Sequence, residues 1–179
     1  MADFIEARIW IKRAVFVLLA CLITIAHLVP LDQRPSIWAP PDILLALVCV
    51  WVARRPDYVP VYIIAAVFFM TDLLLQRPPG LWTALVVLLT EAIRTRHRDL
   101  RTMPFLAEWG FVMIGLVVIT LANRFVLAIV VTPQAPLGLT MMQLGGTIAI
   151  YPLVAFAAYI LFGVAHPAPG DMRKIGQQS

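Results

Sequence analysis

Six apolar runs, separated by short polar segments, constrain the fold of this chain more than any motif does. They cover residues 14–29, 37–52, 58–75, 81–93, 105–131 and 139–165. A helix of about 20 apolar residues crosses the ~30 Å hydrocarbon core of a membrane. The chain is also 61% hydrophobic and only 13% charged, against about 45–50% and about 25% in soluble domains. The sequence therefore predicts an all-α, polytopic integral membrane protein with six transmembrane helices in a compact bundle.

The domain organisation follows from how little sequence lies outside these runs. We expect residues 1–166 to form a single six-helix transmembrane domain and residues 167–179 to form a flexible cytoplasmic tail. The first run is expected to be retained as a span, because no polar mature start follows Cys21. The runs at 37–52 and 81–93 are short for a full crossing. Each is re-entrant, is held among other helices, or crosses with the help of flanking residues; the distribution of basic residues favours full crossings.

The distribution of basic residues predicts the orientation, because positive residues in short loops collect on the cytoplasmic side of a membrane. With six spans and a cytoplasmic N-terminus, eleven of the 14 lysines and arginines fall on the inner side. Arg34 and Arg77 fall on the outer side, and Arg124 lies inside a span. We therefore expect a multi-pass protein with both termini in the cytoplasm.

Polar residues within the spans gather, on this topology, toward the outer side of the membrane. They are His27, Asp42, Asp72, Asn123 and Arg124. A charge at the bilayer centre costs about 2.5–3.5 kcal/mol on insertion scales, so Arg124 needs a partner. We expect it to pair with Asp72 or Asp42, with His27 and Asn123 nearby. Such a cluster is either a structural clamp between helices or a ligand or proton site.

A basic turn follows the fourth run and contains Arg94, Arg96, Arg98 and Arg101. It would help to orient the chain, and it suits anionic lipid or an acidic cytoplasmic partner. We expect Glu91 and Glu108, on either side of the turn, to be solvated at the interface and paired with Arg94 or Arg101. Nucleic-acid binding is not expected, because these arginines have no accompanying aromatic face.

Two features of the last run predict how its helix packs. Gly145 and Ala149 have the small-residue spacing that allows helices to approach closely. Pro152 is expected to kink the helix, with a neighbour satisfying the carbonyl that the proline leaves without a donor.

No motif predicts an enzyme. The only serines, Ser36 and Ser179, lie outside the spans, and the three histidines fall on different elements. The sequence contains no HExxH zinc motif and no glycine motif for phosphates or dinucleotides. We therefore expect a non-enzymatic protein that uses no cofactor and no metal.

Three short segments carry a family resemblance. They read Pro-Asp-Ile-Leu-Leu at 41–45, Arg-Arg-Pro-Asp at 54–57 and Asp-Leu-Leu-Leu-Gln-Arg-Pro-Pro-Gly-Leu-Trp at 72–82. In order and spacing they resemble the bacterial rod shape-determining protein family MreD, in its alphaproteobacterial form. Length, span number and charge distribution agree with that family along nearly the whole chain.

The resemblance implies a non-enzymatic scaffold subunit of the cell-elongation complex in the bacterial inner membrane. Such a subunit would position MreC and the peptidoglycan synthases for lateral wall growth, in contact with membrane lipid. The implied protein partners are MreC, the actin-like MreB, RodZ, the glycosyltransferase RodA and the transpeptidase PBP2. The family is similar in helical arrangement to the substrate-binding subunits of energy-coupling-factor transporters. The matching motif positions, structural or partner-facing, are Pro41, Asp42, Asp72, Leu73, Leu74, Pro79 and Gly80.

The alternative function is that of a small-molecule or lipid-binding membrane transport subunit. In that case His27, Asp42, Asp72 and Arg124 would line an outward-facing pocket. A water-accessible cavity that reaches Arg124 from outside favours this alternative, whereas a closed outer face with an apolar groove favours the scaffold.

Overall fold

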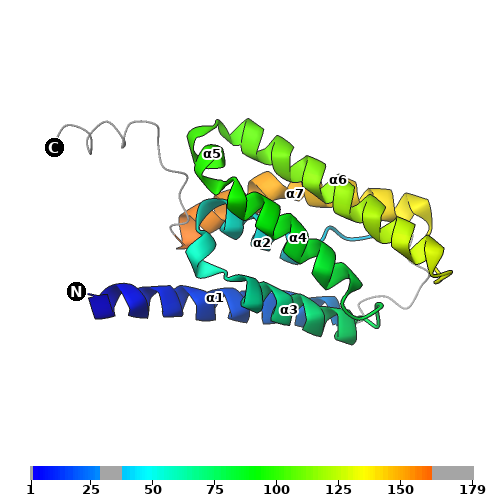
Figure 1. Cartoon of the computed structure of the whole chain (residues 1–179), viewed down its shortest axis with the longest axis horizontal. Helices are drawn as coiled ribbons and strands as arrows, with labels where there is room; N and C mark the ends of the chain where they lie inside the picture. The colour runs from blue at the N-terminus through cyan, green and yellow to red at the C-terminus, as the bar shows by residue number, and fades with distance from the viewer. Residues whose placement is uncertain (1, 29–37, 163–179) are drawn as a thin grey trace.

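A computed structural model of the chain describes residues 2–28 and 38–162, with side chains from residue 6 onward except that of Arg101. Within these ranges all regular structure is helical (Figure 1). The elements are α1 (Ala2–Leu28), α2 (Ile43–Arg54), the 3₁₀ helix η1 (Pro56–Tyr58), α3 (Val61–Leu74), α4 (Leu81–Thr95), α5 (His97–Thr102), α6 (Phe105–Ile129) and α7 (Leu137–Phe162). The prediction of an all-α fold is confirmed, while the predicted tail at 167–179 lies outside the described residues.

Three of the described helices are long and apolar enough to cross a membrane. These spans are Glu6–Leu28, Phe105–Ile129 and Leu137–Leu161, and the helices α2 and α3 are shorter and also apolar. This combination is typical of a multi-pass membrane protein. The helices α2, α3 and α4 have 12, 14 and 15 residues, which at 1.5 Å per residue gives lengths of only ~18–22 Å.

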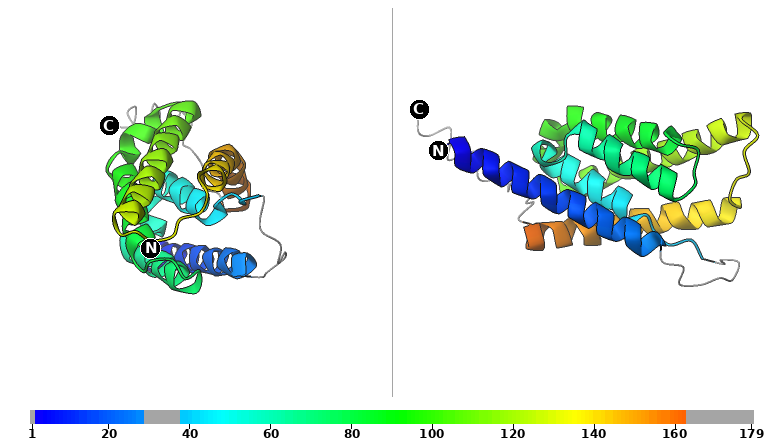
Figure 2. Two further views of the ribbon diagram at one scale, coloured as in Figure 1. Left: turned by 90° about the vertical axis from the view of Figure 1, so that its right-hand side faces the viewer. Right: turned by 90° about the horizontal axis from the view of Figure 1, so that it is seen from below.

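Helix α2 forms the centre of the bundle. Its sequence is apolar on every side, and every residue from Leu44 to Arg54 is buried. It contacts α1, α4, α5 and α7 (Figure 2). The largest buried side chain, Trp51, has its ring centroid 5.6 Å from that of Phe16 on α1. A helix that is hydrophobic all round is expected in such an enclosed position, so this short run is held among other helices.

Several helix ends differ from the predicted ones. Helix α1 starts at Ala2 rather than at residue 14, because residues 2–13 contain neither proline nor glycine, and its N-terminal part extends past the other helices (Figures 1 and 2). Helix α2 starts only at Ile43. The polar segment predicted as a turn is partly helical, since α4 continues to Thr95 and α5 follows directly.

Helix α7 runs without a break through Pro152. A proline has no N–H, so the carbonyl four residues earlier, that of Ile148, loses its helical donor. The indole N–H of Trp109 on α6 donates to this carbonyl at 3.0 Å. The predicted satisfaction of the freed carbonyl by a neighbour is thereby confirmed.

Close helix approach occurs at glycines other than the predicted one. A Cβ on Gly115 of α6 would overlap the side chain of Leu89 on α4, and a Cβ on Gly146 would touch Pro41 at 3.4 Å. Gly145 has nothing within 4 Å of such a Cβ, and Ala149 is exposed. The prediction that Gly145 and Ala149 mark a contact within the bundle is therefore wrong.

Candidate functional site

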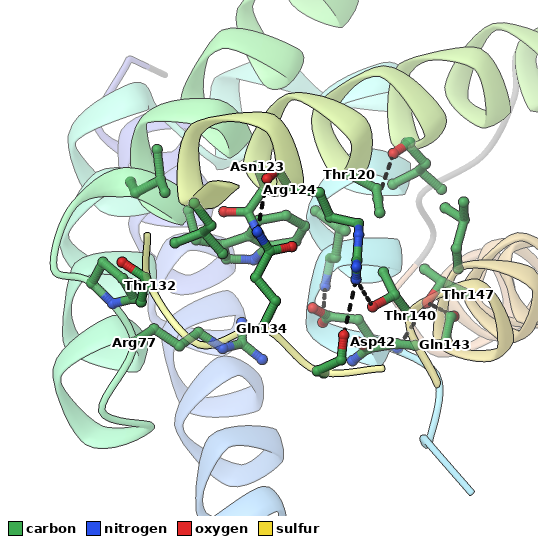
Figure 3. A pocket seen from close by; sticks show the side chains of 18 of the residues that line it. Asp42, Arg77, Thr120, Asn123, Arg124, Thr132, Gln134, Thr140, Gln143 and Thr147 are labelled. Carbon is green, nitrogen blue, oxygen red and sulfur yellow. Dashed lines mark hydrogen bonds between the residues drawn. The ribbon is translucent and has the colours of Figure 1, made fainter. Parts of the chain in front are cut away.

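A cavity of about 350 Å³ lies at the end of the bundle where α2, α4 and α7 begin and where α3 and α6 end (Figure 3). The charge distribution predicts that this end faces outward. The charged and amide side chains that line it are Asp42, Gln76, Arg77, Asn123, Arg124, Gln134 and Gln143. Three residues of the predicted polar cluster are therefore brought to one cavity, namely Asp42, Asn123 and Arg124.

Arg124 contacts the α6–α7 hairpin rather than an aspartate. Its Nη1 donates to the hydroxyl of Thr140 at 2.7 Å and to the carbonyl of Ala135 at 3.1 Å. The side-chain amide of Gln134 donates to the Arg124 carbonyl at 3.1 Å. Among the described residues, no ion pair joins Arg124 to an acid. The predicted pairing with Asp72 or Asp42 is thus wrong, because both carboxylates serve as helix caps.

Asp42 caps α2 and joins it to α7. Its Oδ1 accepts the amide of Leu45 at 2.9 Å, which satisfies one of the free donors at a helix start. Its own amide donates to the hydroxyl of Thr147 at 2.9 Å. Since the preceding residues Pro40 and Pro41 lack N–H groups, the helix begins only after this cap.

Asp72 caps the next helix hairpin. This carboxylate is completely buried near the end of α3. Its Oδ2 accepts the amides of Gly80 at 3.2 Å and Thr83 at 3.1 Å, and the Thr83 hydroxyl at 2.7 Å. Gly80 adopts φ +87°, a left-handed conformation that glycine reaches without steric cost. Asp72 and Gly80 together therefore fix the connection from α3 to α4.

The remaining motif positions differ in exposure. Leu73 and Leu74 are 48% and 50% exposed, and Pro79 is exposed as well. Pro41 instead packs on α7 beside Gly146. The motif thus contains a structural part, formed by Pro41, the two aspartates and Gly80, and an apolar exposed part.

His27 lies next to the cavity rather than in it. It is exposed at the end of α1 and lines a much smaller adjoining cavity together with Asp42 and Arg77. Asp72 lines neither cavity. The predicted cluster is therefore divided, with His27 at its edge and Asp72 buried between α3 and α4.

At the cavity end, α3 and α6 end in the same way, with a residue other than glycine in the left-handed conformation. After α3, Gln76 has φ +52°, and the Arg77 amide donates to the Asp72 carbonyl at 3.0 Å. After α6, Val131 has φ +54°, and the Thr132 amide donates to the Leu127 carbonyl at 3.0 Å. Both are Schellman ends, in which glycine normally occupies the left-handed position. Both ends leave side chains on the rim of the cavity.

A second polar cluster, which the sequence analysis missed, lies at the opposite end of the bundle. Glu108 on α6 is 1% exposed, and its Oε1 lies 3.5 Å from Nε of Arg54. The Tyr151 hydroxyl donates to the same carboxylate at 2.8 Å, and Nη1 of Arg54 donates to the Ala155 carbonyl at 3.1 Å. The predicted solvation of Glu108 at the interface is wrong, because α2, α6 and α7 enclose it.

The sequence signal for this cluster was Glu108, an acid inside an apolar run. A charged side chain in such a run requires a partner. Two basic residues that are closer in the sequence, Arg94 and Arg101, were expected to pair with it. The structure pairs it instead with Arg54, which lies 54 positions away and which the charge count had placed only on the inner side of the membrane. Proximity in the sequence therefore predicted the wrong ion-pair partner for Glu108.

The basic turn has a largely structural environment. The predicted pair of Glu91 with Arg94 is confirmed at 2.7 Å, and Arg94 also donates to the carbonyls of Pro56 and Val59. The guanidinium of Arg96 lies 5.6 Å from the Phe111 ring centroid. Arg98 is exposed, and the side chain of Arg101 lies outside the described residues.

Comparisons with known proteins add no assignment: no protein-family model, no curated protein sequence and no solved structure matches the chain. Within residues 2–28 and 38–162, no three histidine, cysteine, aspartate or glutamate side chains come together as metal ligands would. The cavity with its two arginines is therefore the main candidate binding site among the described residues.

Proposed function

We propose that this protein is a non-enzymatic scaffold subunit of the bacterial cell-elongation complex, related to the MreD family. In this proposal six helices cross the inner membrane, both termini lie in the cytoplasm, and the spans hold MreC beside the peptidoglycan synthases RodA and PBP2. The inner loops face MreB and RodZ. The arrangement would resemble that of the substrate-binding subunits of energy-coupling-factor transporters.

The observation that carries this proposal is the role of the motif residues. Asp42 and Asp72 are 30 positions apart, yet each caps a helix at the same end of the bundle. The segments whose order and spacing resemble the MreD family therefore share a structural role in this chain, which supports the proposal.

The exposed apolar surface also supports a protein that acts through lateral contacts. Leu18 and Leu22 on α1 and Phe156 and Ile160 on α7 are each more than 60% exposed. Such surfaces suit lipid tails or the spans of other subunits. The described chain offers little mass outside its helices for any other kind of contact.

Depletion and complementation in the bacterium of origin test the proposal. Depletion should convert rods to rounded cells, and co-purification from solubilised membranes should recover MreC. The variant Leu74→Ala should reduce MreC recovery, because this motif residue is 50% exposed at the outer end of α3. Leu121→Ala on α6, which is 53% exposed and outside the motif, is the matched control. Unchanged cell shape on depletion, or no recovery of MreC, would contradict the proposal.

The cavity favours a second candidate function, that of a small-molecule or lipid-binding transport subunit. A cavity of about 350 Å³ that reaches Arg124 is within the ~300–1,000 Å³ range of ligand sites. Co-purification separates the two candidates. Recovery of an ATPase-driven transport module in place of MreC would support transport, and recovery of MreC would support the scaffold.

A further inference from the structure

We propose that the cavity binds a phosphate group, presented either by a lipid headgroup or by a free phosphate ligand. The proposal does not depend on the scaffold function, because it concerns only the chemistry of the cavity wall. It rests on two guanidinium groups that line one cavity and have no carboxylate partner among the described residues (Figure 3).

Arg77 is the first of these groups. Its side chain is only partly exposed, and its guanidinium lies 5.9 Å from the ring centroid of Trp82, which lines the same cavity. In the part of the chain that the structure describes, this guanidinium makes no hydrogen bond or ion pair. Five N–H donors are therefore available at one side of the cavity.

Arg124 is the second group. Its Nη1 is engaged by Thr140 and Ala135, whereas its Nε and Nη2 make no hydrogen bond to the described residues. The contacts of Nη1 therefore fix the guanidinium in place while leaving donors for a ligand. An arginine positioned in this way loses little side-chain entropy when it binds an oxyanion.

The charge balance of the described lining favours an anion. Asp42 is its one acidic residue against two arginines, and the Oδ1 of that acid is already engaged by the Leu45 amide. A partly buried cation without a counter-charge between membrane helices is unfavourable. A bound anion would supply the negative charge that the described lining does not.

Phosphate fits this arrangement better than carboxylate does. One guanidinium already engages both oxygens of a carboxylate in a bidentate pair. Two guanidinium groups from different elements, the α3–α4 connection and α6, are suited to a group with more oxygens. Leu116, Leu127 and Leu144 complete an apolar wall, which suits the body of an amphiphile.

Binding to the purified full-length protein in a neutral detergent tests the proposal. The probes are dihexanoyl phosphatidylglycerol, dihexanoyl phosphatidylcholine and sodium phosphate at constant ionic strength, with the thermal midpoint and Kd measured for each. Saturable binding of phosphatidylglycerol without phosphate binding identifies a headgroup site. Saturable phosphate binding identifies a site for the free anion. Binding of none of the three probes overturns the proposal.

The variants show whether binding takes place in this cavity. Arg77→Gln should weaken Kd about tenfold or more, because one charge-assisted contact is lost. Arg98→Gln removes the same charge from an exposed residue of the basic turn and should leave Kd unchanged. An equal loss in both variants would indicate general surface electrostatics and would overturn the proposal.

Two further variants separate an effect on ligand binding from an effect on folding and test the sign of the charge effect. Arg124→Gln removes contacts to the α6–α7 hairpin, so if its thermal midpoint falls without ligand, Arg77→Gln alone decides the result. Asp42→Asn keeps a residue that can cap α2 and removes the one acidic charge of the described lining. It should bind phosphatidylglycerol or phosphate several-fold more tightly, and weaker binding would contradict the proposed sign of the charge effect.

Discussion

The two ends of the helix bundle differ in whether two of their arginines have a carboxylate partner. At the end near α5, Arg54 and Arg94 each have a glutamate partner, Glu108 and Glu91. At the other end, Arg77 and Arg124 line a cavity, and neither forms an ion pair with a described residue. At the first end both of these arginines are balanced by glutamates of the same chain, whereas at the second end the two cavity arginines have no carboxylate partner among the described residues.

The difference arises from where the acidic residues are used. At the cavity end, the carboxylates of Asp42 and Asp72 accept backbone amides at the starts of α2 and α4. A carboxylate that caps a helix stabilises the start of that helix. It stabilises the charge of a distant guanidinium less than a directly bound carboxylate does. At the other end the glutamates bind arginines directly. The comparison shows that residue types alone do not distinguish a structural clamp between helices from a ligand-binding site.

The largest expected effect comes from breaking the enclosed pair. Glu108→Gln keeps an oxygen that can accept from the Tyr151 hydroxyl but removes the charge beside Arg54, whose side chain is 6% exposed. Loss of one partner of a buried pair costs about 3–5 kcal/mol. Unfolding in mixed SDS micelles should show a loss of this size.

Glu91→Gln is the matched control for this measurement. Its pair with Arg94 is partly exposed, at 40% and 23%, so its loss should cost less than about 1 kcal/mol. Similar losses in both variants would show that the two pairs are equally enclosed, and the contrast between the ends of the bundle would fail.

A smaller effect is expected from the link between α6 and α7. Trp109→Phe removes the donor to the Ile148 carbonyl and should lower the free energy of unfolding by about 1–3 kcal/mol. In a Pro152→Ala background the new N–H can bond that carbonyl within the helix, so Trp109→Phe should cost at least about 1 kcal/mol less. Additive losses in the double-mutant cycle would mean that the two residues do not share this carbonyl.

The smallest effect, a gain in stability, is expected at the cavity rim. Val131 and Gln76 have φ values of +54° and +52°, where a residue other than glycine is strained by roughly 1–2 kcal/mol. Val131→Gly and Gln76→Gly should each raise the free energy of unfolding by about 0.5–1 kcal/mol. Val130→Gly, at φ −80°, should instead lower it. No gain at either position would indicate that these ends are not strained.

Much of the fold was predictable from the sequence because its signals are local. Long apolar runs bounded by prolines gave most helices to within a few residues, and Glu91 with Arg94 is a pair on adjacent helical turns. Pro152 creates an unsatisfied carbonyl wherever it occurs in a helix. Each inference needed only a few neighbouring residues.

The candidate site was predictable only in part, because its contacts depend on tertiary structure. An aspartate near a helix end is equally a cap and a potential ion-pair partner, so Asp42, which precedes α2, and Asp72, near the end of α3, were grouped with Arg124. The burial of Arg54 beside Glu108 brings together residues 54 positions apart, and no local pattern indicates it. Arg77 was counted only as an outer-loop charge, since nothing in its sequence neighbours shows that it lines a cavity.

Cysteine accessibility in intact cells tests most directly the claim that the bundle has an outward cavity end and an inward basic end. In a Cys21→Ser, Cys49→Ala background, Ala135→Cys places a thiol at the exposed cavity rim, and Arg98→Cys places one in the exposed basic turn. A maleimide that does not cross the inner membrane should label position 135 in intact cells and position 98 only after permeabilisation. Labelling of position 98 in intact cells, with position 135 protected, would contradict the account.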